Sequence, residues 1–231
     1  MQIAGLQKTT LVDYPGILAS TIFTPGCNFR CPFCHNPELV LPTKYQDNIP
    51  ETEFFDFLTS RIGKIQGVCI TGGEPLLQPK IEKFISHIKA LGFKVKLDTN
   101  GSFSEKLEEI IKEGDIDYIA MDIKHSKQKY FSAIGIKKNN LLLKNIEKSI
   151  DLIKNSKIDY EFRTTVVKPI HHPDDFPKIG QLINKAKKYY IQNFVHSKHV
   201  KDSADFAPFS ESELEQAKNN IAPFVNFIGI R

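Results

Sequence analysis

Short runs of β-branched and aromatic residues alternate along the chain with longer segments whose apolar residues recur at helical spacing. The runs that we expect to form strands span residues 17–23, 67–71, 93–98, 117–123, 158–167 and 190–196. The segments with helical periodicity span residues 51–62, 79–91, 104–113, 141–155, 174–188 and 210–221. Because strands joined by helical crossovers pair in parallel, the alternation predicts about six βα units.

Six βα units are too few to close the usual eight-stranded barrel. We therefore expect an α/β fold: a partial (β/α)6 barrel, an open parallel sheet with outer helices. A flat doubly wound sheet fits the same alternation. The length suits a single domain over residues 1–231, with a cysteine-rich loop near 24–36 and a variable C-terminal segment near 197–231.

Charge and hydropathy argue against nucleic-acid or membrane partners. The net charge is +4, and the lysines are spread among acidic and apolar residues rather than gathered in a basic stripe interleaved with aromatics. The first residues lack the apolar core of a signal peptide, and the longest apolar runs fall far short of a membrane span. We expect a cytoplasmic protein.

The unusual residues follow the predicted strands. The segment GCNFRCPFCHN follows the first strand, GGEP the second, DTNG the third, DIKH the fourth and KPIHH the fifth. In both candidate architectures the carboxyl ends of parallel strands form the functional edge. These five segments are therefore expected to meet at one rim.

Three cysteines, Cys27, Cys31 and Cys34, are spaced C-x-x-x-C-x-x-C. In a reducing compartment such a cluster is typical of metal ligands or catalytic groups rather than disulfides. A structural zinc site normally needs four protein ligands, and the one other cysteine, Cys69, lies in a predicted strand, where a buried, inert thiol is common.

Two further readings of the cysteines, covalent c-type haem on CPFCH and a redox C-x-x-C pair, both leave Cys27 unused. A four-iron cluster is usually held by four thiolates, so three would leave one iron open to a substrate or cofactor.

The same residues carry a resemblance. Cys27, Cys31, Phe33 and Cys34 match the radical S-adenosylmethionine signature C-x-x-x-C-x-aromatic-C. Together with LVDYPGILASTIFTPGCNFRCPFCHNPELV, the segments TGGEPLLQP, LDTNG and MDIK are similar to the small activating enzymes of glycyl-radical enzymes. The likeness is greatest to the activating proteins of anaerobic ribonucleoside-triphosphate reductase. It thins after residue 125, and NFVHSKHVKDSADFAPFS departs from the expected ending.

This resemblance implies an enzyme that holds a 4Fe-4S cluster on the three catalytic cysteines and cleaves S-adenosylmethionine reductively to a 5'-deoxyadenosyl radical. The radical would generate a glycyl radical on a partner enzyme. The resemblance also implies a low-potential electron donor such as flavodoxin or ferredoxin, and a monovalent cation.

The resemblance further implies a set of residues that bind S-adenosylmethionine. Glycines such as those of GGEP let a ligand approach the backbone, and acids at strand ends can accept ribose hydroxyls or hold a cation. The expected residues are Phe33 against the adenine with His35 bordering the same pocket, Gly72, Gly73 and Glu74 at the amino group, Asp98 and Asp122 at the ribose or the cation, Lys124 at the carboxylate, and Thr99 and His196 near the cofactor.

Three other features remain open at this point. Arg163 either faces the barrel interior or forms a structural ion pair, and Asn100 and Gly101 are expected to form a turn. The adjacent His171 and His172 could suggest a metal site, but before a proline and a capping acid we expect loop residues. Alternative functions are a small-molecule radical enzyme like the 7-carboxy-7-deazaguanine synthases, a non-catalytic iron–sulfur electron carrier, and a zinc-binding interaction module.

Overall fold

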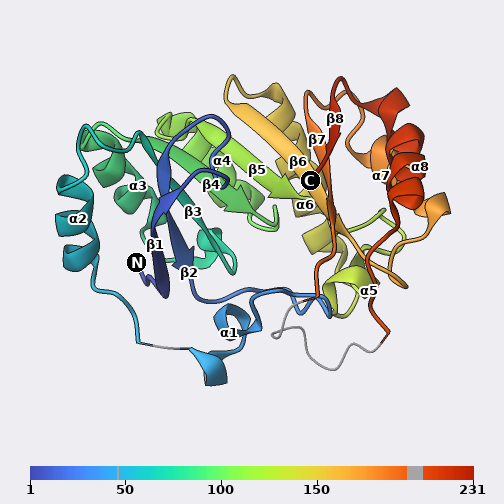
Figure 1. Cartoon of the computed structure of the whole chain (residues 1–231), viewed down its shortest axis with the longest axis horizontal. Coiled ribbons are helices and arrows are strands. Elements are labelled where there is room, and N and C mark those ends of the chain that lie inside the picture. The colour runs from blue at the N-terminus through green and yellow to red at the C-terminus, as the bar shows by residue number, and fades with distance from the viewer. Residues whose placement is uncertain (46, 197–204) are drawn as a thin grey trace.

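The computed structural model describes residues 1–45, 47–196 and 205–231, which form one eight-stranded sheet with helices around it (Figure 1). The strands are β1 (Gly5–Thr10), β2 (Ala19–Thr24), β3 (Gly67–Gly72), β4 (Lys94–Thr99), β5 (Tyr118–Asp122), β6 (Asp159–Val166), β7 (Tyr189–Asn193) and β8 (Ile228–Ile230). The α-helices are α1 (Pro37–Val40), α2 (Glu51–Thr59), α3 (Ile81–Ala90), α4 (Ser104–Glu113), α5 (Tyr130–Ile134), α6 (Asn140–Asn155), α7 (Phe176–Leu182) and α8 (Glu211–Ile221).

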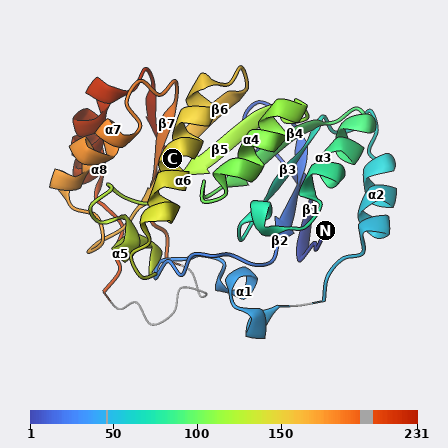
Figure 2. The ribbon, with the colours of Figure 1, turned by 180° about the vertical axis from the view of Figure 1, so that it is seen from behind.

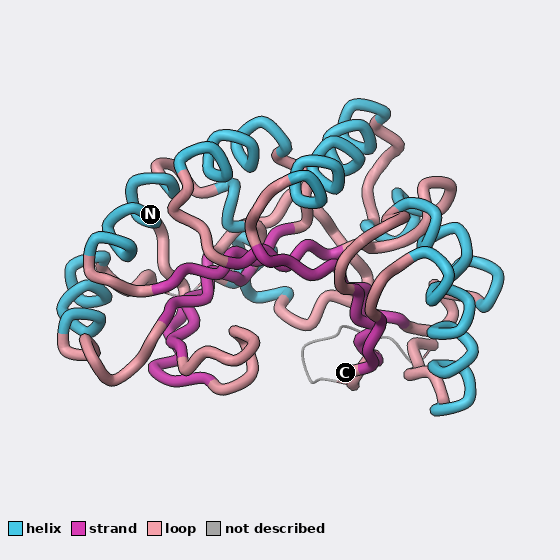
Figure 3. Tube along the Cα trace, turned by 90° about the horizontal axis from the view of Figure 1, so that it is seen from above, coloured by secondary structure: helices cyan, strands magenta, loops and turns pink. Residues whose placement is uncertain are grey.

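The strands lie in the sheet in the order in which they occur in the chain, from β1 to β8. All neighbours from β2 to β8 pair in parallel, and only β1 runs antiparallel to its neighbour β2. Seen from above, the sheet curves into an arc, and the helices cover its convex side (Figure 3). The expected open, partial barrel is confirmed, and within the described ranges no further strand closes the concave side.

Helices pack on the outer face of the sheet because each presents one apolar stripe. In α3, Ile81, Phe84, Ile85 and Ile88 recur at the spacing of a helix face, and all four are buried. The strands beneath turn apolar side chains toward these helices; Val68 of β3, for example, is fully buried in the same hydrophobic cluster as the four α3 residues. Figure 2 shows α3, α4 and α6 lying across this face of the sheet. Among the described residues, no helix is long and apolar enough to cross a membrane.

The six predicted strands all form, with boundaries shifted by a few residues, but the two edge strands were not predicted. β1 has the largely polar sequence GLQKTT, and β8 is only three residues long. The helix expected over 174–188 is wrong in its extent: a 3-10 turn covers Pro173–Asp175, and α7 ends at Leu182. Lys185 takes a left-handed φ of 65°, and its N–H donates to the Phe224 carbonyl, so the helix cannot continue.

Candidate functional site

The cysteine-rich loop connects β2 to α1 and is fixed at both ends by backbone hydrogen bonds. The Gly26 N–H donates to the Leu39 carbonyl at 2.7 Å, and the Arg30 N–H donates to the Ile134 carbonyl of α5 at 2.8 Å. Cys27, Cys31 and Cys34 are free, partly buried thiols. The loop thereby directs all three sulfur atoms toward the carboxyl ends of the parallel strands.

A pocket of about 480 Å³ lies between this loop and the strand ends. The loop and α1 contribute Cys27, Phe29, Cys31, Phe33, Cys34, His35, Asn36 and Val40, and the strand ends contribute Thr71, Gly72, Gly73, Asp98, Thr99, Asn100, Asp122, Lys124, Arg163, Thr165, Gln192, Asn193 and Val195. The structure therefore brings eleven of the thirteen expected site residues to one rim, all except Glu74 and His196.

The two glycines after β3, Gly72 and Gly73, allow two backbone segments to lie unusually close together. A Cβ atom on Gly73 would lie 2.0 Å from the Gly26 carbonyl oxygen, and one on Gly72 would lie 2.4 Å from the Thr24 nitrogen. Gly72 also has a φ of 118°, which favours glycine. The Gly73 N–H donates to the Thr24 carbonyl, and the Glu74 N–H donates to the Gly26 carbonyl. The TGGEP segment therefore fixes the position of the start of the cysteine loop, and its glycines also line the pocket.

Glu74 is fully buried, and its side chain points into the protein interior rather than into the pocket. Its carboxyl accepts hydrogen bonds from the Thr99 hydroxyl at 2.8 Å, from the Asn100 N–H at 2.6 Å and from the Leu76 N–H at 3.1 Å. Burial raises the pKa of this carboxyl to about 7 although these donors oppose the rise. Glu74 thus joins the end of β3 to the end of β4.

Asn100 extends this connection to the cysteine loop. Its side-chain amide donates to Asn28 at 3.0 Å and lies 3.9 Å from the Cys27 sulfur, while the Asn28 amide donates to the Ser102 hydroxyl. The sequence read Asn100 as a turn residue, and its Asn-Gly signal does mark a turn, with Gly101 at a φ of 76°. Its buried contact with the loop comes from a residue far away in sequence, so no local signal could have found it.

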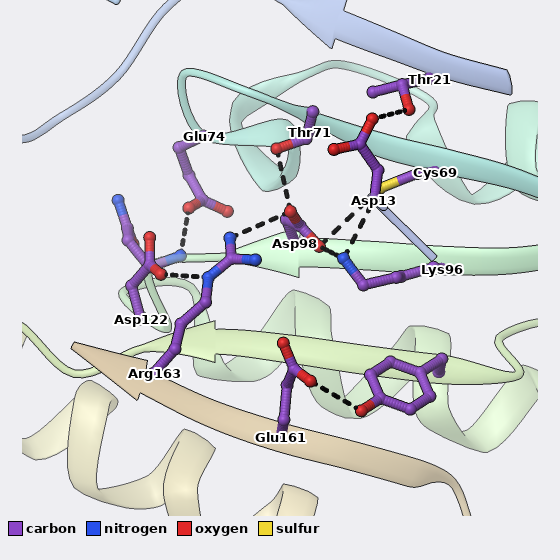
Figure 4. A network of polar contacts seen from close by, with 12 residues as sticks. Asp13, Thr21, Cys69, Thr71, Glu74, Lys96, Asp98, Asp122, Glu161 and Arg163 are labelled. Carbon is purple, nitrogen blue, oxygen red and sulfur yellow. Dashed lines mark hydrogen bonds and ion pairs between the residues drawn. The ribbon is translucent and has the colours of Figure 1, made fainter. Parts of the chain in front are cut away.

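Charged residues fill the floor of the pocket (Figure 4). Arg163 of β6 donates to Asp98 of β4 at 2.9 Å and to Asp122 of β5 at 2.6 Å, and thus both faces the interior and forms ion pairs. The buried Lys96 pairs with Asp98, and Lys124 pairs with Asp122 at 2.9 Å. Although burial opposes it, Arg163 and the two lysines hold the pKa values of both carboxyls below their usual range.

Aromatic side chains border the other side of the pocket. Phe33 is buried against Val167 and Phe194, and the His35 ring lies 5.3 Å from Phe194. The His35 Nε2 atom is 3.0 Å from the Val195 carbonyl oxygen. His196 is exposed, and its ring packs edge-on against Phe194. Part of the variable C-terminal segment, residues 197–204, lies outside the described residues.

Sequence reasoning missed a buried histidine pair behind Phe33. His171 and His125 stack with ring centroids 4.8 Å apart, and the edge of the Phe33 ring meets His171 at 6.1 Å. His171 is 1% exposed, its Nε2 is 3.0 Å from the Lys124 carbonyl oxygen, and burial lowers its pKa to about 4. The neutral ring fixes the backbone at Lys124, so His171 is no ordinary loop residue.

The donor set fits an iron–sulfur cluster better than a single metal ion. Burial raises the pKa of Cys27 to about 11 and of Cys31 to about 12, so these groups are thiols until a metal displaces their protons. Among the described residues, no three His, Cys, Asp or Glu side chains converge on one ion position. A cluster offers each thiolate a separate iron, so its ligands lie farther apart than those of one zinc ion.

Cys69 does not supply a fourth ligand at this rim. It is fully buried in β3, and its sulfur lies 3.6 Å from the Lys96 Nζ atom beneath the pocket floor. The expectation of a buried cysteine there agrees with the structure.

Comparison with known proteins agrees with the geometry. Residues 21–183 match the family described as the radical SAM superfamily. The chain is 32% identical to a Methanocaldococcus jannaschii protein named as a glycyl-radical enzyme activating enzyme, over 99% of this chain and 95% of that one. It is also 32% identical to the pyruvate formate-lyase-activating enzyme of Staphylococcus aureus, over 97% of this chain and 95% of that one.

Among solved structures, Streptococcus suis SuiB bound to S-adenosylmethionine superposes with a TM-score of 0.69. The superposition covers 91% of this chain and 51% of SuiB at 13% sequence identity, so it supports the fold alone.

Replacing Gly73 by alanine should loosen the cysteine loop. The new Cβ atom would overlap the Gly26 carbonyl, and relieving such overpacking costs roughly 1–3 kcal/mol. We expect Gly73→Ala to bind less iron per chain after anaerobic reconstitution, measured by iron assay. Gly5→Ala is the matched control, since its Cβ would make only ordinary contacts of 3.4 Å or more. Equal iron content in the two variants would contradict the role given to Gly73.

Glu74 should make the stability of the metal-free chain depend on pH. The pKa of Glu74 is about 7 in the folded chain and the ordinary 4.5 in the unfolded chain, so the folded carboxyl keeps its proton to a higher pH. The contribution of this group to the free energy of unfolding is therefore complete below pH 4.5 and falls by roughly 3 kcal/mol as the pH rises to about 7. Glu74→Gln should flatten this slope in urea unfolding at pH 5 and 7.5.

The control for this experiment is Glu109→Gln, because the Glu109 side chain is exposed on α4 and should leave the slope unchanged. A Glu74→Gln slope as steep as that of the wild-type chain would contradict the assignment.

Proposed function

We propose that this chain, which belongs to the radical S-adenosylmethionine superfamily and to the glycyl-radical enzyme activating enzymes within it, installs a glycyl radical on anaerobic ribonucleoside-triphosphate reductase. The observation that carries the proposal is the single rim on which Cys27, Cys31 and Cys34 face Gly73 and Thr99 across one pocket. That arrangement suits a cluster with an open iron beside a bound cofactor.

The chemistry that the family implies is transfer of one electron from a 4Fe-4S cluster to S-adenosylmethionine, which gives methionine and a 5'-deoxyadenosyl radical that abstracts a hydrogen atom. Cys27, Cys31 and Cys34 would each ligate one iron. The pocket then has to orient methionine and adenosine against the remaining iron, because the reacting centres must lie in contact.

The pocket residues can be assigned to the parts of the cofactor by their chemistry. Backbone carbonyls beside Gly72 and Gly73 can accept from the methionine amino group, with the Thr99 hydroxyl nearby. The Lys124 ammonium can pair with the carboxylate, although it also pairs with Asp122. Asp98 stays a candidate for the ribose hydroxyls.

Glu74 would act indirectly, by fixing Thr99 and Asn100. Phe33 and His35 would border the adenine. His196 could join them only by moving, since its side chain is exposed.

The shape of the sheet supports a protein as substrate. β1 and β8 are the two ends of one open sheet, and in the view from above they lie apart on either side of the concave face (Figure 3). A loop of another protein that carries the target glycine could approach the pocket from that side. Two relatives named as activating enzymes of glycyl-radical proteins support the same substrate class.

We choose the reductase over other glycyl-radical enzymes because the segments from LVDYPG to MDIK resemble those of its activating proteins. A low-potential flavodoxin or ferredoxin would supply the electron, and a cytoplasmic location remains a prediction. The alternatives are the small-molecule radical enzyme and the electron carrier, and they differ from the activase in needing no protein substrate.

The test is to incubate the reconstituted, reduced chain with S-adenosylmethionine and the reductase of the same organism without oxygen. We expect the doublet paramagnetic resonance signal of a glycyl radical on the reductase, with 5'-deoxyadenosine as coproduct. Cys31→Ala should give neither. Pyruvate formate-lyase serves as the matched second partner.

A radical on pyruvate formate-lyase alone would move the proposal to that partner. Deoxyadenosine without a radical on any glycyl-radical enzyme would favour a small-molecule substrate. No cleavage at all by the loaded chain would favour the electron carrier.

A further inference from the structure

The two acids expected to hold a monovalent cation are already joined by an arginine. Asp98 lies near the end of β4, and Asp122 is the last residue of β5. The Arg163 side chain, from the neighbouring strand β6, reaches both (Figure 4). The Arg163 Nε atom donates to Asp122 Oδ1 at 2.6 Å, and its Nη2 atom donates to Asp98 Oδ2 at 2.9 Å. The guanidinium therefore occupies the position between the carboxylates.

Each of the four carboxylate oxygens has a cationic partner. Asp98 Oδ1 pairs with Lys96, and Asp122 Oδ2 accepts from Lys124 at 2.9 Å. Asp98 Oδ2 also accepts from the Thr71 hydroxyl at 3.1 Å. A potassium or sodium ion at these oxygens would have to share every one of them with a protein cation, which would repel it.

Protein side chains supply the positive charge around the pair. Asp98 and Asp122 face three protein cations, those of Lys96, Lys124 and Arg163. Asp13, from the loop after β1, is held separately by the Thr21 hydroxyl at 2.6 Å (Figure 4). Glu74 is satisfied separately by donors from the ends of β3 and β4.

Arginine suits such a position for two reasons. Its planar group donates from several nitrogens in fixed directions, so it can hold two carboxylates at once, and it stays protonated at any working pH. The Arg163 side chain is only 16% exposed, and the lowered pKa values of both acids show that the protein cations stabilise their charged forms. The protein's own cations thus hold the pocket floor together.

We propose that Arg163 takes the place of the monovalent cation, so that S-adenosylmethionine binding by this chain needs no potassium or sodium ion. Arg163 acts as a positioning residue: it holds Asp98 and Asp122, and through Asp122 it orients Lys124 toward the pocket. The inference rests on the proposed function only in that S-adenosylmethionine is taken to bind in this pocket.

The first measurement is the affinity of the cluster-loaded chain for S-adenosylmethionine in potassium, sodium or tetramethylammonium chloride of equal ionic strength. We expect the wild-type affinity to agree within about twofold among the three salts, because tetramethylammonium is too large to coordinate the aspartates. A roughly tenfold weaker affinity in tetramethylammonium, which added potassium restores in a saturable manner, would overturn the inference.

Arg163→Met tests the same idea in the opposite direction. Removing the guanidinium takes one cationic partner from each of the two carboxylates. The variant should therefore bind S-adenosylmethionine roughly tenfold more weakly in tetramethylammonium and recover part of that loss in potassium or sodium. Arg61→Met is the matched control, since Arg61 packs over Phe57 away from the pocket. A variant that loses affinity equally in all three salts would contradict the substitution of arginine for a cation.

A second readout needs no S-adenosylmethionine. The line width of the sodium-23 resonance broadens when sodium ions exchange with a protein site, and it can be measured on the cluster-free chain. We expect no specific broadening with the wild-type chain and broadening with Arg163→Met. Broadening by the wild-type chain that Asp98→Asn abolishes would overturn the inference, whatever the chain does with S-adenosylmethionine, and so separates this failure from failure of the proposed function.

Discussion

The close contact between the backbone at Gly72 and Gly73 and the backbone at Thr24 and Gly26 is the constraint on which the site depends. Two hydrogen bonds, donated by the Gly73 and Glu74 N–H groups to the Thr24 and Gly26 carbonyls, join the end of β3 to the start of the cysteine loop. No side chain fits between these segments, because a Cβ atom at either glycine would overlap the opposite backbone. The loop can therefore present its cysteines only in register with the strand ends.

Hydrogen bonds connect this contact to the neighbouring strands. Glu74 ties β3 to Thr99 and Asn100 at the end of β4, and Asn100 returns to the loop through Asn28. Arg163 then joins β4, β5 and β6 through Asp98 and Asp122. Polar groups buried in this way are costly unless each has a partner, so the network specifies one arrangement of the rim.

The six inner strands could be predicted because each is a short apolar run between helical segments, and the motif positions followed from the rule that parallel strands share a carboxyl edge. β1 and β8 could not be predicted in this way, because their sequences GLQKTT and IGI carry little pattern and their pairing with β2 and β7 decides their structure. The left-handed turn at Lys185, which ends the α7 region, likewise depends on a bond to distant Phe224.

Within the site, the sequence indicated which residues take part but not the direction in which their side chains point. The sequence pointed to Glu74 as a cofactor contact, whereas the structure turns it toward Asn100. Arg163 remained open between an interior and a structural role because both of its partners lie on other strands. His171 looked like a loop residue because nothing local shows that His125 and Phe33 cover it. Contacts between residues far apart in sequence decide all three cases.

Three cysteines are proposed to hold a cluster whose remaining iron faces a cofactor pocket. The electron paramagnetic resonance spectrum of the reduced, cluster-loaded chain, recorded with and without S-adenosylmethionine, tests this arrangement. We expect a four-iron signal whose shape changes when S-adenosylmethionine is added, because the ligand would bind the open iron. A four-iron signal that is indifferent to S-adenosylmethionine would contradict it and leave a closed electron-carrying cluster, and a chain that binds zinc but no iron would contradict it more broadly.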